Sequence, residues 1–532
     1  MRHEPAVDPL IAPPSWTALI GRIFSRLSHF WFIYTAIGVA GLGVLYGILF
    51  TSEANAELVV SIFVVVTMML IIANNPLTGM LIWLAVTAFV ETWINIPMEA
   101  GIPDLTFSRF ITAFLVIFML AKAATGEFQF RRMGLTEIGI LLTTLGIATA
   151  ASLSTRPTDV VQTALTLHFT PMVVFFFAKN LVRDEHALNK LFWALTLFGF
   201  AAAVYAIYEY STGNILFLEK GISPDQLLVQ YTDSLRLIRG LLGRSSNFAR
   251  VLAATIPISF YLLFENKTAT RKVALVGMLL VQAYGMFLTF NRTSWYTLLV
   301  ALAILQFLYP RFRRAFVLIV LVAGVTLWAT WDQVNESAVF EERVNSKVST
   351  LEGREARWEA GYNMWQAEPI RGWGFGRYQQ ESGRFRTDGD HRNFLAIEND
   401  YLHILIGAGL IGFLPYAVFL LTPLLKSIGL FFRARAPDWS GFIKPETIVI
   451  YWCIMLSFLV GSYSQIQTQP IVKMIPFAVA GAVIGTHEHL LRKARSGVKT
   501  AAHSVRRARD SGWGIGTRSK ERPVLDPGKS RS

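Results

Sequence analysis

Long apolar runs separated by polar connectors recur along most of the chain. Each run has roughly 17 to 22 residues, and at about 1.5 Å per helical residue such a run crosses about 30 Å of hydrocarbon. We expect an all-α polytopic membrane protein with about 12–14 transmembrane helices. The fourteen apolar runs lie at 30–50, 57–74, 77–95, 106–121, 135–153, 160–178, 188–208, 248–264, 273–290, 293–309, 315–331, 400–424, 446–463 and 470–486.

The composition agrees with this class, because 53% of the 532 residues are hydrophobic and only 16% are charged. The single cysteine, Cys453, lies inside an apolar run, so the chain alone can build neither a disulfide nor a thiolate metal site.

Basic residues concentrate in alternate connectors. If the N-terminus is cytoplasmic, one face collects basic pairs such as Arg131/Arg132 and Arg433/Arg435, whereas the opposite connectors 51–56 and 464–469 contain no Lys or Arg. This is the distribution of the positive-inside rule, and it makes the basic face cytoplasmic.

The net charge of +13 has a local origin, because twelve of the 49 Lys and Arg lie after residue 487. We therefore expect a cytoplasmic tail at 1–29, a membrane domain at 30–487 and a basic, disordered cytoplasmic tail at 488–532. The expected partner of that tail is the anionic surface of the lipid bilayer. Nucleic acid is not an expected partner.

Two connectors on the outer face, 209–247 and 332–399, are long. The second has acidic, basic and apolar residues at helical spacing, followed by the glycine-rich GWGFG at 372–376. We expect one or two amphipathic helices, a glycine-rich turn and a return to the membrane at 399. GWGFG lacks the strand, Lys and Ser/Thr of a phosphate loop, so we do not expect nucleotide binding.

Arg292 lies in the very short outer turn NRTS, where a guanidinium at the headgroup boundary needs an anionic partner. A lipid phosphate is one candidate. The other is a pyrophosphate ligand, since RGLLGRSSNFAR at 239–250 can bring Arg239, Arg244 and Arg250 to the same side.

Titratable groups also collect where the apolar run at 400 begins, in HRNFLAIENDYL. Glu398 and His391 are candidates for proton transfer. The structural alternative is that Asn399 caps the helix and that acids favour the positive end of the helix dipole.

Four segments, in this order, resemble the O-antigen ligase and polymerase superfamily of bacterial inner-membrane glycosyltransferases. They are GLLGRSSNFA at 240–249, FLTFNRTSWYTLL at 287–299, REARWEAGYNMWQAEPIRGWGFG at 354–376 and ENDYLHILIGAGLIGF at 398–413. The resemblance implies a GT-C-like membrane enzyme whose site faces the periplasm and takes an oligosaccharide linked to undecaprenyl diphosphate. Its arginines would bind the diphosphate, and a base in the large loop would activate a hydroxyl of the glycan acceptor.

By this resemblance Arg292 matches the turn arginine, and Arg244 or Arg250 matches the second one. Arg239, Arg354 and Asn399 are further candidates for substrate binding. Ligases and the related protein O-oligosaccharyltransferases have a His-Asn pair where this chain has Glu398-Asn399. The acidic residue favours a polysaccharide polymerase, with ligation as the alternative within the family. The expected reaction inverts the anomeric centre and requires no cofactor or metal.

A lipid-linked oligosaccharide flippase is the rival from another class. A flippase would place charges along the bundle interior and show related halves, whereas mid-span charges are few here, with His168 the clearest, and no internal repeat is apparent. Further expected partners are proteins of polysaccharide assembly, such as a chain-length regulator.

Overall fold

The structure is a computed structural model. It describes residues 56–91, 95–96, 105–216, 230–232, 235–236, 238–239, 241–329, 347–389, 391–394, 396–437, 439–464, 469–486 and 488. The predicted span at 30–50 and both predicted tails lie outside the described residues, apart from Glu488. The chain divides after Thr486, and every helix named below belongs to the unit before that division.

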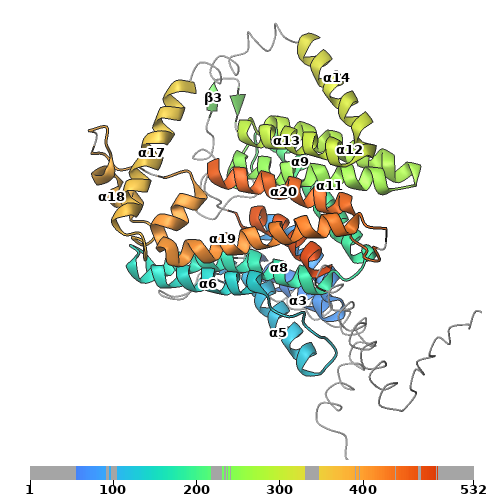
Figure 1. Cartoon of the computed structure of the whole chain (residues 1–532), viewed down its shortest axis with the longest axis horizontal. Helices are drawn as coiled ribbons and strands as arrows, with labels where there is room; N and C mark the ends of the chain where they lie inside the picture. The colour runs from blue at the N-terminus through green and yellow to red at the C-terminus, as the bar shows by residue number, and fades with distance from the viewer. Residues whose placement is uncertain are drawn as a thin grey trace, which may run out of the picture. The chain divides into compact units, whose positions relative to one another are not determined.

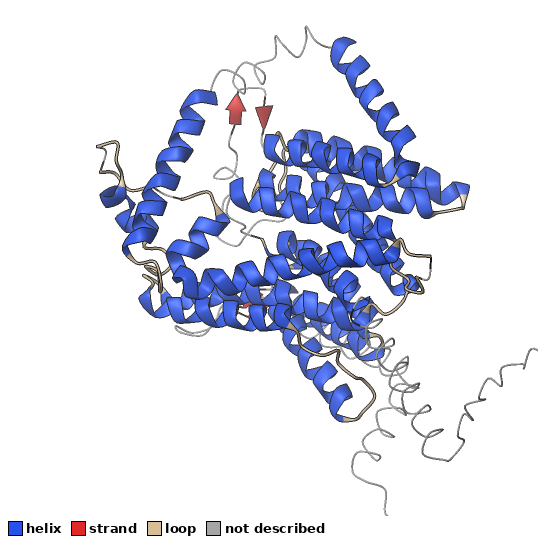
Figure 2. Cartoon of the chain, in the orientation of Figure 1, coloured by secondary structure: helices blue, strands red, loops and turns tan. Residues whose placement is uncertain are grey.

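Helices dominate the described residues (Figure 2), and they coincide with the other thirteen predicted spans. In chain order they are α3 (Ala56–Asn74), α4 (Pro76–Val90), α5 (Phe107–Ala124), α6 (Leu135–Ala150), η2 (Ala151–Leu153), α7 (Pro157–Ala164), the π-helix η3 (Leu165–Phe169), α8 (Thr170–Leu181), α9 (Glu185–Thr212), α11 (Ser245–Glu265), α12 (Ala269–Leu288), α13 (Arg292–Leu308), η4 (Pro310–Phe312), α14 (Arg313–Ala329), α17 (Lys347–Ala367), α18 (Tyr378–Glu381), η5 (Ser382–Phe385), α19 (Asp400–Ala434), α20 (Pro445–Ser464) and the helix Pro470–Thr486.

Within the described ranges, eight helical segments are long and apolar enough to cross a membrane, and three shorter apolar helices accompany them. The protein is therefore an all-α polytopic membrane protein. Its described strands form only two short antiparallel ribbons, β1 (Asn95–Ile96) with β2 (Leu105–Thr106) and β3 (Gln230–Thr232) with β4 (Leu235–Arg236).

Local sequence sets where individual helices begin and end. Asn75 caps α4 by accepting from Thr78 N, and Asp184 caps α9 by accepting from Ala187 N. α9 ends at Gly213, whose φ of +76° suits glycine. The predicted loop 209–247 is therefore shorter than expected, since α9 includes its first residues and α11 begins three residues before the predicted span at 248.

The helices that carry the predicted site residues begin at one end of the bundle. Connectors of three residues join α11 to α12 and α12 to α13, so α13 begins at the end where α11 begins. Arg250, near the start of α11, donates to the carbonyl of Gly461 in the last turn of α20, and Tyr401 in α19 donates to Leu459. We call this the α17 end, because α17 packs against α19 there (Figure 1).

The glycine-rich turn predicted at 372–376 packs against a break in α19. Gly409 inside α19 has a non-helical φ of +57°. Trp373 N donates to Ile406 O at 2.8 Å, and Gly374 N donates to Gly407 O at 3.0 Å. The turn therefore supplies hydrogen-bond partners to helical carbonyls at the point where α19 bends, and it fixes the connector 368–377 to the membrane helix.

The described part of the loop 332–399 is folded, and it shares a small core with the first turns of α19. Met364, Tyr378, Ile397 and Ile406 are buried together, and the partly buried aromatic residues around them include Trp358, Trp365, Trp373, Phe385 and Phe394. The three tryptophans are therefore partly buried and pack against this core.

Candidate active site at the start of helix α19

Glu398 and Asn399 form a strained entry to α19. Glu398 has φ of +52°, which is rare for a residue with a side chain, and Asn399 Oδ1 accepts from Tyr401 N and Leu402 N at 3.0 and 3.1 Å. The capping predicted for Asn399 is confirmed. Backbone strain of this kind costs about 1–3 kcal/mol and clusters at functional sites, so the strain at Glu398 points to a role beyond capping.

The Glu398 carboxylate lies between two arginines of α17. Its Oε2 is 3.3 Å from Arg354 Nε and 3.1 Å from Arg357 Nη1, and all three side chains are about one-third exposed. Burial raises the pKa of the Tyr378 hydroxyl, which therefore stays protonated and donates to the carbonyl of Arg357 at 2.9 Å. The loop core thus holds α17 so that both guanidinium groups reach the start of α19.

The turn before α13 repeats the backbone pattern of the turn before α19. Phe290 has φ of +50° and precedes Asn291, whose Oδ1 accepts from Ser294 N at 3.0 Å. Phe290 and Glu398 are the two non-glycine residues with positive φ in the described ranges. Arg292 therefore occupies the first position of α13, beside the positive end of the helix dipole, where an anion is favoured.

Charged side chains are also buried around Asp400, two residues after Glu398. Asp400 and Lys473 are almost completely buried, with Lys473 Nζ 3.2 Å from Asp400 Oδ2. Arg250 is also buried and interacts electrostatically with Asp400 and Arg244. Its Nη2 donates to Gly461 O at 2.7 Å, while its Nη1 has no hydrogen-bond partner among the described residues.

The other predicted site residues lie around this centre. Arg244 is the exposed residue that precedes α11. Arg239 is half-buried, and its backbone N–H donates to Glu209 Oε1 at 2.8 Å. His391 is exposed in the segment that leads to Glu398. The structure brings Glu398 and Arg354 into contact, and places Arg250 beside Asp400.

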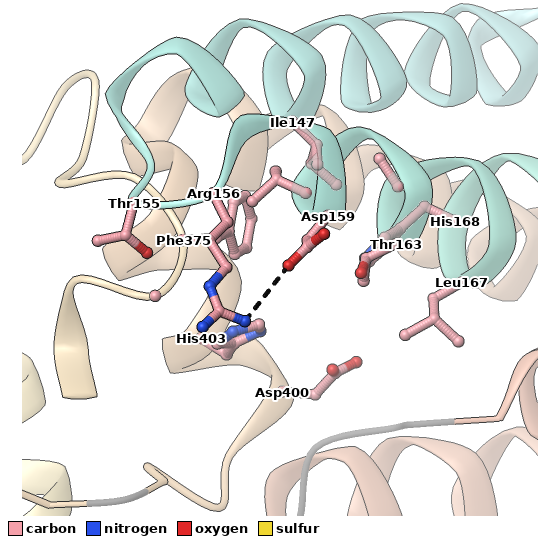
Figure 3. Close-up of a pocket in the computed structure, with 13 residues that line it drawn as sticks. Ile147, Thr155, Arg156, Asp159, Thr163, Leu167, His168, Phe375, Asp400 and His403 are labelled. Atoms are coloured by element: carbon pink, nitrogen blue, oxygen red, sulfur yellow. Dashed lines mark ion pairs between the residues drawn. The ribbon is translucent and has the colours of Figure 1, made fainter. Parts of the chain in front are cut away.

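A cavity of about 220 Å³ lies beside the first turn of α19, where Asp400 and His403 line it (Figure 3). Its walls come from α6, the segment 155–168, the glycine-rich turn and the first turn of α19. The polar lining residues are Thr155, Arg156, Asp159, Thr163, His168, Asp400 and His403. Among the described residues, no group of three or more His, Cys, Asp or Glu side chains is placed to hold a metal ion.

The sequence analysis did not single out Lys473, Arg357, Arg156 or Asp159, although it noted His168 as a charge within a predicted span. Lys473 carried a usable signal, since it is a lone basic residue inside an apolar run, and such residues mark functional or paired sites. Arg156 and Asp159 carried no such signal, because they lie just before the predicted span at 160–178, where charged residues are common at the membrane interface.

Comparison with protein families places most of this site in one segment. Residues 274–417 match the family model described as O-antigen ligase. This matched segment is therefore similar to the O-antigen ligase family. It contains Arg292, Arg354, Glu398, Asn399 and Asp400, and it confirms the resemblance to the O-antigen ligase and polymerase superfamily over these residues. No curated protein matches the chain at a significant level of similarity.

The matched segment does not include every residue around the site. Arg239, Arg244 and Arg250 precede it, and Lys473 follows it. The buried ion pair Asp400–Lys473 and the bond from Arg250 to Gly461 therefore tie the matched segment to helices outside it.

Proposed function

We propose that the protein is a polysaccharide polymerase of the bacterial inner membrane. It transfers glycan from undecaprenyl diphosphate to a hydroxyl of an acceptor sugar at the periplasmic face. The observation that carries this proposal is Glu398, a carboxylate on a strained backbone between two arginines, inside the segment that matches the O-antigen ligase family.

Cationic groups at the α17 end suit the diphosphate of the donor. Arg250 is buried, and its Nη1 has no hydrogen-bond partner within the described ranges. Arg244 is exposed at the cap of the same helix, and Arg292 begins α13 at the same end. Guanidinium groups bind phosphate oxygens through paired hydrogen bonds, and helix N-termini add to the attraction for an anion.

Glu398 is the proposed general base. Both arginines contact Oε2, and Oε1 is the atom that we assign to the acceptor hydroxyl. The hydroxyl oxygen attacks the anomeric carbon while its proton moves to Glu398, and the bond from that carbon to the phosphate oxygen breaks. The diphosphate leaves with the electron pair, stabilised by the arginines. Attack opposite the leaving group inverts the anomeric configuration, and the arginines supply the positive charge without a metal ion.

Ligation is the second candidate, and the description of the matching family favours it. In a ligase the acceptor would be a lipid A core, a protein or another final carrier. The acidic residue at 398, where ligases of the superfamily have histidine, favours polymerisation.

The deletion phenotype separates these candidates. Loss of a polymerase leaves single repeat units on the final carrier, whereas loss of a ligase leaves long chains on undecaprenyl diphosphate. If neither glycan pattern changes in the deletion strain, both assignments are wrong.

Complementation with Glu398→Gln and Arg292→Gln tests the residues. We expect each variant to lose at least about a hundredfold in polymer yield. The matched controls are Glu359→Gln and Arg384→Gln, since both side chains are exposed on the same loop; they should restore normal polymer. Full activity of Glu398→Gln would remove that residue from the chemistry.

A further inference from the structure

The cavity beside the α19 N-terminus is the second polar feature of the α17 end. Asp400 lines its floor, and Asp400 is two residues from Glu398 and interacts with Arg250. Asp400 therefore connects the cavity with the proposed diphosphate-binding arginine, and the chain runs from the cavity lining to the proposed catalytic carboxylate within two residues.

Charge indicates what the cavity can hold. Its ionisable lining consists of one guanidinium, Arg156, and two carboxylates, Asp159 and Asp400, together with the imidazoles of His168 and His403. The guanidinium is already 3.7 Å from Asp159 (Figure 3). The Asp400 carboxylate is in turn 3.2 Å from Lys473 Nζ. Because each carboxylate of the lining is paired with a cation, the lining suits a neutral ligand with many hydroxyl groups.

A buried polar atom of the lining also favours a ligand with hydroxyl groups. His168 is 6% exposed and lines the cavity, and its Nδ1 has no hydrogen-bond partner among the described residues. Asp159 and Thr163 are exposed at the mouth, so the lining runs from an open rim to a buried polar floor. A buried polar atom without a partner costs free energy that a ligand hydroxyl can recover.

Size and shape also suit a sugar ring. The volume of about 220 Å³ equals that of about seven liquid water molecules. Phe375 provides an apolar wall, and its backbone N donates to Ser154 Oγ at 2.8 Å, which ties the glycine-rich turn to the segment before α7. A preformed pocket with one aromatic wall and converging polar groups is the usual form of a small-ligand site.

We propose that this cavity binds the acceptor sugar. The assignment rests on the proposed transferase function and adds the location of the second substrate. Asp159 and Arg156 at the mouth and His168 and His403 deeper in the cavity hydrogen-bond the hydroxyl groups of the ring, and Phe375 packs against its apolar face. The attacking hydroxyl is thereby presented at the start of α19.

The test uses the full-length protein in nanodiscs. Lipid-linked repeat units purified from the deletion strain serve as donor, and the oligosaccharide released from them by mild acid serves as a soluble acceptor. Thr163→Trp narrows the cavity, and Thr158→Trp is the matched control, because it lies on the same helix and does not line the cavity. Binding of undecaprenyl diphosphate is followed separately by thermal stabilisation.

We expect Thr163→Trp to raise the KM for the soluble oligosaccharide about tenfold or more and to leave stabilisation by undecaprenyl diphosphate unchanged. Thr158→Trp should behave like the wild type. Asp159→Asn preserves the volume of the side chain and should raise the KM for the soluble oligosaccharide about threefold or more. This variant replaces Thr163→Trp in the test if the tryptophan variant does not fold.

Two results would overturn the assignment alone: an unchanged KM in both cavity variants, or loss of undecaprenyl diphosphate stabilisation in Thr163→Trp, which would place the donor in the cavity. A wild-type protein that joins no sugars would overturn the proposed function and this assignment together.

Discussion

Removing the positive member of the buried ion pair should strongly destabilise the protein. Lys473 Nζ lies 3.2 Å from Asp400 Oδ2, and the two side chains are 0% and 3% exposed. At an effective dielectric constant of about 20, their attraction is about 5 kcal/mol. Desolvation opposes most of that gain, but breaking such a pair leaves a buried charge and typically costs about 3–5 kcal/mol.

Arg250 also interacts with Asp400 and offsets part of the loss, so we expect Lys473→Met to lower the free energy of unfolding by about 3 kcal/mol. The double variant Lys473→Met/Asp400→Asn should lose about 2 kcal/mol less than the sum of the two single variants, because neither charge is then left alone. The matched control is Lys122→Met, whose partner Glu127 is 3.8 Å away and exposed; it should change stability by less than about 1 kcal/mol.

The assay is reversible unfolding in mixed detergent micelles, followed by circular dichroism and repeated for each variant of the cycle. The coupling would be refuted if each single variant lowered the free energy of unfolding by less than about 0.5 kcal/mol. It would also be refuted if the loss in the double variant equalled the sum of the two single losses within about 0.5 kcal/mol.

Two further substitutions test the entry to α19 and its break. Gly372→Ala should lower the free energy of unfolding by at least about 3 kcal/mol, because the added Cβ would lie 2.5 Å from Gly409 N and 2.6 Å from Ile406 O. The control Gly389→Ala has a similar φ of +76° and no atom within 4 Å of the added Cβ, so it should lower that free energy by only about 1 kcal/mol. Equal losses in these two thermal unfolding experiments would show that the close packing is irrelevant. Asn399→Ala removes the side-chain oxygen that caps α19 and should lower the free energy of unfolding by about 1 kcal/mol. Asn399→Ser keeps a capping oxygen and should retain most of that stability. An unchanged melting curve for the alanine variant would contradict the capping.

Helix positions were largely predictable because the hydrocarbon thickness imposes a minimum length on each apolar run. The turn that carries Arg292 and the cap at Asn399 were predictable as well, since both depend on a few adjacent residues. The helix α17 followed from the spacing of charged and apolar residues in the large loop.

Contacts between distant segments were not predictable. Nothing local in the sequence shows that Lys473 pairs with Asp400, or that Arg250 reaches the carbonyl of Gly461. The glycines of GWGFG carried only a weak signal, because their role appears once Gly374 lies against Gly407. The cavity requires four segments to be in place and leaves no mark on any one of them.

The central claim is that the α17 end joins sugars carried on a lipid diphosphate. The most direct measurement supplies purified, reconstituted protein with labelled lipid-linked repeat units and separates the products by size. The account predicts glycans of two and more repeat units, with an inverted linkage and undiminished yield in a metal chelator. Labelled donor that crosses the bilayer without any new glycosidic bond would contradict it and identify a flippase.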